Sequence, residues 1–501
     1  MRHTSHATVA SAAAGLLLAV AAMQTPSRVD AAQGANAGRE GGATPAAAEV
    51  SQTPCVGQIS GTRPVTDVFK PGFTHLTGAK ANDSFGVAVA SGDIDHDGFS
   101  DIVVGARGDF TSNDNKGLVY IYKGSKAGLV TTPALVLESE QPKSEFGRTL
   151  IAGDINGDGY ADVIVGAHGF NGGVGSHQGK VYVYLGGPKG LATTPSQTLL
   201  GEVKGGEFGR TFDIVDVNGD GINDLLLGAS GYGGDLSNQG KAYVYLGTRT
   251  GLDSRPYFTA VGEKTNDEFG RAISAADVNG DGFTDLVIAS TGGTGSNNSK
   301  NTVPGSMYVY YGSAKGFGTD YSAKFDGEFP KGHLGEGMFA VGDLNHDGYA
   351  DIAIGARDFA CGGGVAGKVY AYLGGPKGLS ADRVWTAVGI GDGGVGRSIA
   401  PAGDLDGDGY QDFLSGAPVG TVDKGAGLYM FFGGAKNWGS KPVVINANDG
   451  ENAIGFGLFS AGDVNGDSAP DIVVGARDGG DAKQGWARVY YGKKGSLAIK
   501  R

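Results

Sequence analysis

Oxygen-bearing side chains recur at fixed spacing in one nine-residue stretch, Asp154-Ile155-Asn156-Gly157-Asp158-Gly159-Tyr160-Ala161-Asp162. They occupy positions one, three, five and nine, and the carbonyl oxygen of Tyr160 at position seven is a further candidate ligand. The glycine at position six lets the backbone turn sharply enough to direct these oxygens to one point. Such a set of oxygens suits a hard divalent cation, whereas a single acidic turn is equally typical of a solvated loop.

Recurrence of the turn decides between these two interpretations. Related turns begin at Asp93, Asp154, Asp216, Asp277, Asp343, Asp404 and Asp463. Their separations are 61, 62, 61, 66, 61 and 59 residues, and self-similarity at a fixed period indicates a modular array. Seven chance acidic loops would not keep this spacing. The pattern therefore predicts up to seven metal sites, one in each repeat, with Ca²⁺ as the cofactor because every ligand is a hard oxygen.

In each turn the predicted ligands are the side chains at positions one, three, five and nine and the carbonyl oxygen at position seven. Turn by turn they are Asp93, Asp95, Asp97, Phe99 and Asp101; Asp154, Asn156, Asp158, Tyr160 and Asp162; Asp216, Asn218, Asp220, Ile222 and Asp224; Asp277, Asn279, Asp281, Phe283 and Asp285; Asp343, Asn345, Asp347, Tyr349 and Asp351; Asp404, Asp406, Asp408, Tyr410 and Asp412; Asp463, Asn465, Asp467, Ala469 and Asp471. The seventh turn departs from the others, because Ser468-Ala469-Pro470 replaces the usual step that contains glycine.

Two familiar calcium motifs do not fit these turns. An EF-hand needs a bidentate Glu at position 12 and a following helix, but position 12 holds Val104, Val165, Leu227, Ile288, Ile354, Ser415 and Val474. A calcium-binding β-roll would repeat Gly and Asp every nine residues, which this chain does not do.

The charge of the chain follows from the turns. Net charge is −13, from 53 acidic and 40 basic residues. The seven turns hold 23 Asp, which leaves 30 acidic residues elsewhere, so without its turns the chain would be mildly basic. No polybasic tract indicates nucleic acid or an anionic membrane as a partner. Glycine makes up 94 of 501 residues, which favours many tight turns over long helices.

The first residues have the pattern of a secretory signal peptide over 1–32. Arg2 and His3 precede an apolar run from Ala12 to Met23, and small residues follow. We expect export to a secreted or periplasmic location, with residues 33–71 as a disordered linker and amino-terminal tail and no transmembrane segment. Cys55 and Cys361 either form a disulfide or remain two unpaired thiols.

Each repeat contains four short strand-like segments. In the second repeat these are 135–138, 148–153, 163–167 and 180–185. Seven repeats of four strands predict an all-β fold, a seven-bladed β-propeller over residues 72–495, with a tail at 496–501. The segment 73–78 resembles the missing outer strand of the last repeat and is expected to pair with it and close the ring.

Two short sequence steps mark every repeat. Phe-Gly, or an apolar-Gly pair, opens it at Phe85, Phe146, Phe208, Phe269, Leu334, Val395 and Ile454. A Gly-Ala step, or Ala289-Ser290 in the fourth repeat, ends the segment after the turn. We expect both steps to pack in the core, with the small residues allowing neighbouring sheets to approach closely.

These steps and turns together resemble the FG-GAP repeats of integrin alpha subunits over roughly residues 72–495. The resemblance implies a seven-bladed propeller with calcium in the hairpin loops, and adhesion or ligand binding as the usual activity. The chain departs from integrins in keeping the turn in all seven repeats. We expect neither the stalk domains nor the transmembrane helix of integrins, so that signalling across a membrane is not part of what the resemblance implies.

Alternating strand direction places the turns on one face of the disc and the variable loops on the other. Calcium is therefore expected to be structural, and a ligand, an extracellular protein or a glycan, is expected on the face opposite the calcium loops. The variable loops are Gly108–Lys116, Gly231–Gln239, Thr291–Pro304 and Asp358–Ala366. A purely structural surface component that assembles with other chains is a third interpretation.

The competing function is an exported hydrolase or lyase with its site at the axial mouth of the propeller. Its sequence support is weak, because the chain has neither a Gly-x-Ser-x-Gly elbow nor a His-Glu-x-x-His motif. Arg107, Arg357 and Arg477 follow Gly-Ala steps and either line the mouth for an acidic ligand or pair with neighbouring carboxylates. No catalytic residue is therefore assigned, and a non-catalytic binding module is predicted.

Overall fold

The computed structural model describes residues 58–59, 61–109, 116–293, 304–361, 364–382, 384–419, 425–435, 441–446 and 453–493. The predicted signal peptide at 1–32 lies outside these residues, as do Cys55, most of the loop Thr291–Pro304 and the tail at 496–501. Cys361, the other cysteine of the chain, is disulfide-bonded.

Seven four-stranded antiparallel sheets form the blades of a propeller, as predicted. Blades one to four contain β2 (Phe85–Gly92), β3 (Asp101–Ala106), β4 (Leu118–Tyr122) and β5 (Leu135–Glu138); β6 (Thr149–Gly153), β7 (Asp162–Ala167), β8 (Lys180–Tyr184) and β9 (Gln197–Leu200); β10 (Thr211–Val215), β11 (Asp224–Ala229), β12 (Lys241–Tyr245) and β15 (Phe258–Val261); β16 (Ala272–Ala276), β17 (Asp285–Ser290), β18 (Ser306–Tyr310) and β19 (Ala323–Asp326). Blades five to seven contain β20 (Leu334–Gly342), β21 (Asp351–Ala356), β24 (Lys368–Tyr372) and β25 (Val384–Val388); β26 (Ser398–Gly403), β27 (Asp412–Ala417), β28 (Gly427–Phe431) and β29 (Val443–Asn446); β30 (Ile454–Gly462), β31 (Asp471–Ala476), β32 (Trp486–Tyr490) and β1 (Thr74–Thr77).

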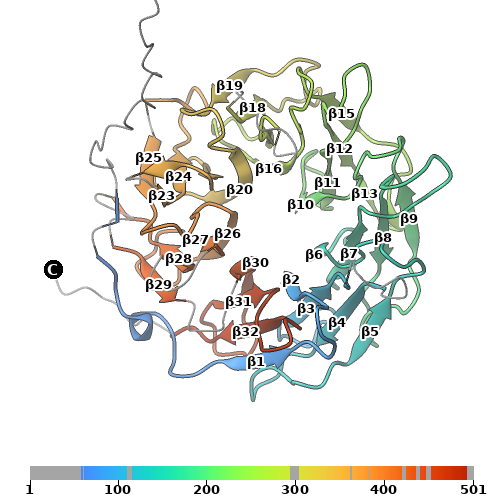
Figure 1. Ribbon diagram of the computed structural model, residues 1–501, viewed down its shortest axis with the longest axis vertical. Coiled ribbons are helices and arrows are strands. Elements are labelled where there is room, and N and C mark those ends of the chain that lie inside the picture. The colour runs from blue at the N-terminus through green and yellow to red at the C-terminus, as the bar shows by residue number, and fades with distance from the viewer. Residues whose placement is uncertain are drawn as a thin grey trace, which may run out of the picture. The chain divides into compact units, whose positions relative to one another are not determined.

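The first strand of each repeat lies innermost in the ring (Figure 1). Two-stranded ribbons, β13 (Gly247–Thr248) with β14 (Gly251–Leu252) and β22 (Ala360–Cys361) with β23 (Gly364–Val365), and the 3-10 turn η1 (Val65–Asp67) complete the described elements.

The ring closes through β1, the strand nearest the amino terminus. It pairs antiparallel with β32, in the register Thr74 to Val489 and Thr77 to Trp486, so the predicted closure is confirmed. Figure 1 shows this first strand beside the last blade. Closure removes the open edge that β32 would otherwise expose.

The cores lie between neighbouring blades, and the two recurring sequence steps contribute to them beside the Val, Ile, Leu and Tyr side chains of the strands. Phe85, for example, is completely buried and meets Tyr120 edge-on, with 5.2 Å between ring centroids. A side chain added at Gly105 would overlap the carbonyl oxygen of Gly147 in the next blade. Small residues at the Gly-Ala step are therefore required by the close approach of the sheets.

The spacing of the opening step has a structural consequence. It lies eight residues before the turn in repeats one to four and nine residues before it in repeats five to seven. In blades five to seven the extra residue forms an irregularity in the ladder just before the turn, between Ala340 and Gly342, Pro401 and Gly403, and Ser460 and Gly462. The bulge absorbs one residue and leaves all seven turns in the same place.

Residues 61–71, which the sequence assigned to the disordered tail, instead pack against the last two blades. Val68 and Phe69 are buried in a core shared with blades six and seven. Arg63 donates its backbone N–H to Pro442 O at 3.0 Å, and Lys70 donates to Tyr491 O at 2.8 Å. The described part of this segment is an ordered strap because two of its side chains are apolar and bury surface.

Removing all residues up to Thr77 should open the ring. The variant would leave the edge of β32 unpaired and would lose the buried side chains of Leu76 and Phe69. We expect a melting temperature lower by several degrees and self-association, measured by thermal melting and by light scattering after gel filtration. A truncation that ends at residue 57 keeps β1 and the strap and is the matched control; equal behaviour of the two truncations would contradict closure by β1.

A buried carboxyl links the inner strands of three blades. Asp213 on β10 accepts a hydrogen bond from Ser274 Oγ on β16 at 2.6 Å, and Ser274 Oγ accepts one from the backbone N–H of Ala340 on β20 at 3.0 Å. Burial raises the pKa of Asp213 from 3.8 to about 7. The folded protein therefore holds this proton more tightly than the unfolded chain does.

This linkage predicts a pH-dependent effect of Asp213→Asn. A raised folded-state pKa contributes stability below about pH 4, and that stability is lost as the pH rises through about 7. The melting temperature of the Asn variant minus that of the wild type should therefore grow between pH 5 and pH 8. Asp235→Asn, in an exposed loop, is the control. A difference that stays constant over this pH range would contradict the assignment.

Candidate functional site

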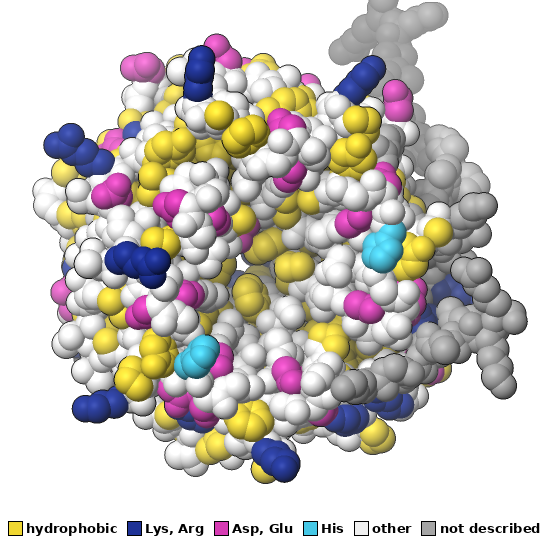
Figure 2. Space-filling view, turned by 180° about the vertical axis from the view of Figure 1, so that it is seen from behind, with side chains coloured by type: hydrophobic (Ala, Val, Ile, Leu, Met, Phe, Trp, Pro, Cys, Tyr) yellow, Lys and Arg dark blue, Asp and Glu magenta, His cyan; other side chains and the backbone are white. Residues whose placement is uncertain are grey.

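The seven turns all connect the innermost strand of a blade to its second strand. In blade two, β6 ends at Gly153 and β7 begins at Asp162, so the turn fills the gap between them. Because every blade repeats this order, all turns lie on one face of the ring, as predicted. Figure 2 shows a face on which acidic side chains surround a central hollow while Lys and Arg side chains lie at the periphery.

Backbone N–H groups fold each turn around its first carboxylate. Asp154 accepts from Gly157 N at 2.7 Å through Oδ1 and from Gly159 N at 2.8 Å through Oδ2. Asp158 at position five accepts from Tyr160 N at 3.0 Å. Two of these hydrogen bonds recur in all seven turns. The N–H of position six donates to the carboxylate of position one, and the N–H of position seven donates to the carboxylate of position five. The oxygen-rich turn is thus already formed by local hydrogen bonds.

The seventh turn keeps this geometry without the glycine. Ser468 occupies position six with a φ of 65° and donates its N–H to Asp463 Oδ2 at 2.7 Å. The serine therefore adopts the left-handed conformation that glycine supplies elsewhere.

The carboxylate at position nine has a structural role that the sequence did not reveal. Asp162 accepts from Ile155 N at 3.0 Å and from Gly186 N at 2.8 Å, so it ties the turn to the loop that follows the third strand. Equivalent bonds occur in all seven blades, and all seven carboxylates are completely buried. Burial raises their pKa values, from about 6 at Asp101 to about 8 at Asp412. An oxygen that accepts a single hydrogen bond keeps a further lone pair for a cation, whereas Asp101 Oδ2 accepts from both Ile94 N and Lys123 Nζ.

Position three divides the turns into two kinds. In the turns that have Asp there, three carboxylates lie within 4.8 Å of one another: Asp93, Asp95 and Asp97 in the first, and Asp404, Asp406 and Asp412 in the sixth. The other five have Asn, and in the second turn its Nδ2 donates to Asp158 Oδ2 at 3.0 Å. Asp95 Oδ1 and Asp406 Oδ1 are buried and accept no hydrogen bond from the described residues. Orphaned oxygens beside two further carboxylates fit a Ca²⁺ ion.

Lysine and arginine side chains contact four of the turns: Arg249 donates to Gly157 O in the second turn at 2.9 Å, and in three other turns the contact is with a carboxylate. Lys123 pairs with Asp95, and lies 3.4 Å from Asp101 Oδ2. From the strap, Arg63 Nη1 lies 3.1 Å from Asp406 Oδ2, and Lys70 pairs with Asp467. Sequence reasoning missed the two strap residues because they are separated from their partners by 343 and 397 positions.

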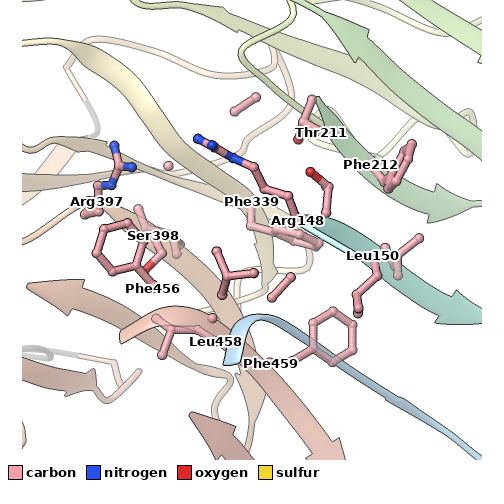
Figure 3. A pocket seen from close by; sticks show the side chains of 18 of the residues that line it. Arg148, Leu150, Thr211, Phe212, Phe339, Arg397, Ser398, Phe456, Leu458 and Phe459 are labelled. Atoms are coloured by element: carbon pink, nitrogen blue, oxygen red, sulfur yellow. The ribbon is translucent and has the colours of Figure 1, made fainter. Parts of the chain in front are cut away.

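The opposite end of the inner strands surrounds a cavity of about 260 Å³ at the axial mouth. The residue after the opening step of each repeat lines it, and these residues are Val87, Arg148, Arg210, Arg271, Glu336, Arg397 and Phe456. Arg477 also lines the cavity. Figure 3 shows Arg148 and Arg397 at the cavity together with apolar side chains such as Leu458 and Phe459. In the sequence, three arginines of this cavity are indicated by the repeated Phe-Gly-Arg step at Arg148, Arg210 and Arg271.

Glu336 is the one carboxylate among the lining residues. Its side chain is 3 % exposed, and Oε1 lies 2.6 Å from Arg271 Nη2, 3.5 Å from Arg357 Nη1 and in contact with Arg397. Burial alone would raise the pKa of Glu336, but the charges of the three arginines outweigh it and hold the pKa well below its usual range. Glu336 is therefore ionised, and its negative charge is shared by the guanidiniums of three arginines.

The three arginines that the sequence singled out have different places. Arg477 lines the cavity and Arg357 reaches Glu336, as described above. Arg107 donates to Ser84 Oγ at 3.4 Å and is not among the lining residues. The sequence left two interpretations open, that these arginines line the mouth or that they pair with neighbouring carboxylates. Both apply in part, because Arg357 also contacts Asp358 and Arg477 also contacts Asp478.

Two histidines contact carboxylates at this end of the blades. His168 Nε2 lies 3.1 Å from Glu145 Oε2, and His333 Nδ1 contacts Asp358. Burial lowers the pKa of His168 to about 4, so its imidazole is neutral at physiological pH. Neither histidine lines the cavity.

Comparison with known proteins matches the repeats that these turns define. FG-GAP repeats match residues 85–122, 146–184, 269–310, 339–372 and 395–429, and an FG-GAP-like repeat matches 216–288. Phosphatidylinositol-glycan-specific phospholipase D from Bos taurus is 35 % identical over 183 residues, which are 35 % of this chain and 22 % of that protein. Integrin alpha-5 from Xenopus laevis is 31 % identical over 230 residues, 44 % of this chain and 21 % of the integrin. Integrin alpha-7 from Rattus norvegicus is 37 % identical over 158 residues, which are 31 % of this chain and 13 % of that integrin.

The chain thus spans about a fifth of the length of these relatives, or less. Over the described ranges, no helix has the length and apolar character needed to cross a membrane. The matched repeats agree with the structure, which has a ring of seven blades and a turn in every blade. The chain is an FG-GAP repeat protein whose seven-bladed propeller resembles that of integrin alpha subunits.

Proposed function

We propose that this protein is an exported, calcium-binding propeller that acts as a non-catalytic adhesion or ligand-binding module. The observation that carries the proposal is the preformed oxygen turn in all seven blades, with buried, unpartnered oxygens at Asp95 and Asp406. The side chains at positions one, three, five and nine and the carbonyl oxygen at position seven would hold each ion. Calcium would neutralise carboxylates that are crowded at the ends of the inner strands.

Calcium is proposed as structural because each turn joins two strands and is tied to a third segment by its ninth residue. Asp162, for example, links the turn after β6 to Gly186 after β8. An ion at this point would fix the inner three strands of one blade relative to each other. The variable loops lie at the other end of the strands, which leaves that face for an extracellular protein or glycan.

Binding is favoured over catalysis by the composition of the axial cavity. Among its lining residues Glu336 is the single carboxylate, and three arginines hold it in the ionised form. Such a carboxylate is poorly suited to act as a general base or acid near neutral pH. The similarity to a phospholipase D covers 22 % of that enzyme and gives no reason to assign its reaction here.

The experiment that tests the proposal has two parts. Calcium binding is measured by titration calorimetry on chelator-treated protein, with up to seven ions per chain expected. Glycan arrays and extracellular-protein arrays are then probed with and without calcium, alongside a panel of hydrolase and lyase substrates. Binding of less than one ion per chain, or turnover of a substrate in the panel, would overturn the proposal.

A further inference from the structure

The arrangement of charge at the axial mouth is layered. Five arginines line the cavity, namely Arg148, Arg210, Arg271, Arg397 and Arg477, against one carboxylate, Glu336. The other acidic partners lie outside the lining: Glu145 is 2.6 Å from Arg148, Glu207 is 3.3 Å from Arg210 and Asp478 is 3.1 Å from Arg477. The inner layer is therefore cationic, and an outer layer of carboxylates holds the guanidiniums in place.

The guanidiniums keep donors for a ligand. Each carries five N–H groups. Among the described residues, the hydrogen bonds of Arg148, Arg271 and Arg397 each use one nitrogen, directed to Glu145 for the first and to Glu336 for the other two. Arg210 uses one nitrogen, which faces both Glu207 and His168. The remaining donors are available to face an acceptor in the cavity.

Two of these guanidiniums are destabilised by burial and by neighbouring cations, whereas nearby carboxylates, Glu336 foremost, outweigh burial and raise the pKa of Arg271. Burial, together with the charges of Arg271 and Arg148, lowers the pKa of Arg210 to about 9. Burial, together with Arg357, Arg271 and Arg477, lowers the pKa of Arg397 to about 10 despite the opposing effect of Glu336. An anion in the cavity would offset this repulsion, and its charge would be poorly screened because the side chains are largely buried.

Beyond the arginines most lining residues are apolar, and Thr149, Thr211 and Ser398 add hydroxyl groups. Each inner strand runs from the mouth toward its turn, so the residue two positions further on lies deeper. Those residues are Val89, Leu150, Phe212, Ile273, Met338, Ile399 and Leu458. The site therefore combines a cationic rim with a mostly apolar interior, and its volume lies just below the range of about 300–1,000 Å³ that is usual for small-molecule sites.

We propose that the axial mouth binds a compact organic anion, which carries at least two carboxylate or phosphate groups on an apolar body. The acidic groups would meet Arg148, Arg210, Arg397 and Arg477, as bidentate pairs where geometry allows. The apolar body would contact the deeper side chains. This inference rests on the ligand-binding role proposed above and names the chemistry of the ligand.

The test uses the full chain with saturating calcium and three probes. Benzene-1,3-dicarboxylate represents the carboxylate arm, 1,3-phenylene bisphosphate the phosphate arm with the same number and placement of acidic groups, and benzyl alcohol is the uncharged control. We expect saturable binding of at least one acidic probe by titration calorimetry and none of benzyl alcohol. Whichever arm binds more tightly identifies the acidic group.

Variants assign the binding to the mouth. Arg148→Gln combined with Arg397→Gln should weaken binding of the acidic probe at least tenfold. Arg249→Gln is the matched control, because Arg249 is an exposed arginine that contacts the turn at Gly157 on the other face, and it should change binding less than twofold. Unchanged affinity in the double variant would overturn the assignment.

A second measurement avoids the risk that the double variant does not fold. Phenylglyoxal modifies accessible arginines, and peptide mass spectrometry of the wild type should show that the acidic probe protects Arg148 and Arg397 but not Arg249. Absence of protection, or absence of binding by both acidic probes, would overturn the inference. If calcium and an array ligand still bind in that case, the proposed function stands and the anion site alone fails.

Discussion

Treatment with an excess of EGTA is expected to lower the melting temperature of this protein by roughly 12 °C. Extracellular calcium modules bind with dissociation constants of about 0.1 to 1 mM. At about 1 mM calcium, a site of about 0.1 mM contributes RT ln(11), about 1.4 kcal/mol, and seven independent sites contribute on the order of 10 kcal/mol. With an unfolding entropy of about 2.1 cal/mol/K per residue over the 400 described residues, this corresponds to about 12 °C.

The physical reason is that the turns gather carboxylates whether or not an ion is bound. Hydrogen bonds to the backbone hold position one, position five and position nine in place, so the repulsion among them remains after chelation. Differential scanning calorimetry checks the result. Calcium added in excess over EGTA should restore the melting temperature, and magnesium at the same concentration should not, because it requires a smaller and more rigid octahedral site. An unchanged melting curve in EGTA would falsify the structural role of calcium.

Glu336→Gln is the substitution with the largest expected effect on stability. The variant keeps the shape of the side chain but removes the negative charge that Arg271, Arg357 and Arg397 share. Removing one partner from a buried ion pair leaves uncompensated charge and typically costs about 3–5 kcal/mol. We expect a loss of this size in the free energy of unfolding, measured by chemical denaturation with calcium held constant.

The matched control is Glu202→Gln, on the periphery of the ring. Glu202 Oε1 lies 2.9 Å from Lys241 Nζ, but the glutamate side chain is 46 % exposed. Exposed pairs contribute about 0–1 kcal/mol, so this variant should be close to wild type. Equal destabilisation by the two substitutions would show that the location of Glu336 among three arginines is unimportant. A stable Glu336→Gln variant would contradict the charge balance that we assign to the mouth.

The sequence alone determined the features that depend on residues close together in the chain. The turn at Asp154 is formed by hydrogen bonds within nine residues, and so its spacing is visible without a structure. The number of blades follows from its sevenfold recurrence. Closure by residues 73–78 could also be predicted, because the last repeat ends without an outer strand and the same pattern appears before the first.

Only the tertiary structure decided which distant side chains meet. Residues 61–71 have no repeat pattern, and their place on blades six and seven depends on the burial of Val68 and Phe69. Arg63 and Lys70 reach the turns of those blades only through that packing.

The axial mouth shows the same division most clearly. Phe-Gly-Arg was present in the sequence, but a single repeat cannot show whether its arginine points to the axis or pairs locally. Ring closure brings the equivalent positions of seven blades around one cavity, where Arg271, Glu336 and Arg397 come from three different repeats. The sequence therefore determined the repeating unit, whereas the convergence of charge at the centre arises from circular symmetry, which places residues about sixty positions apart side by side.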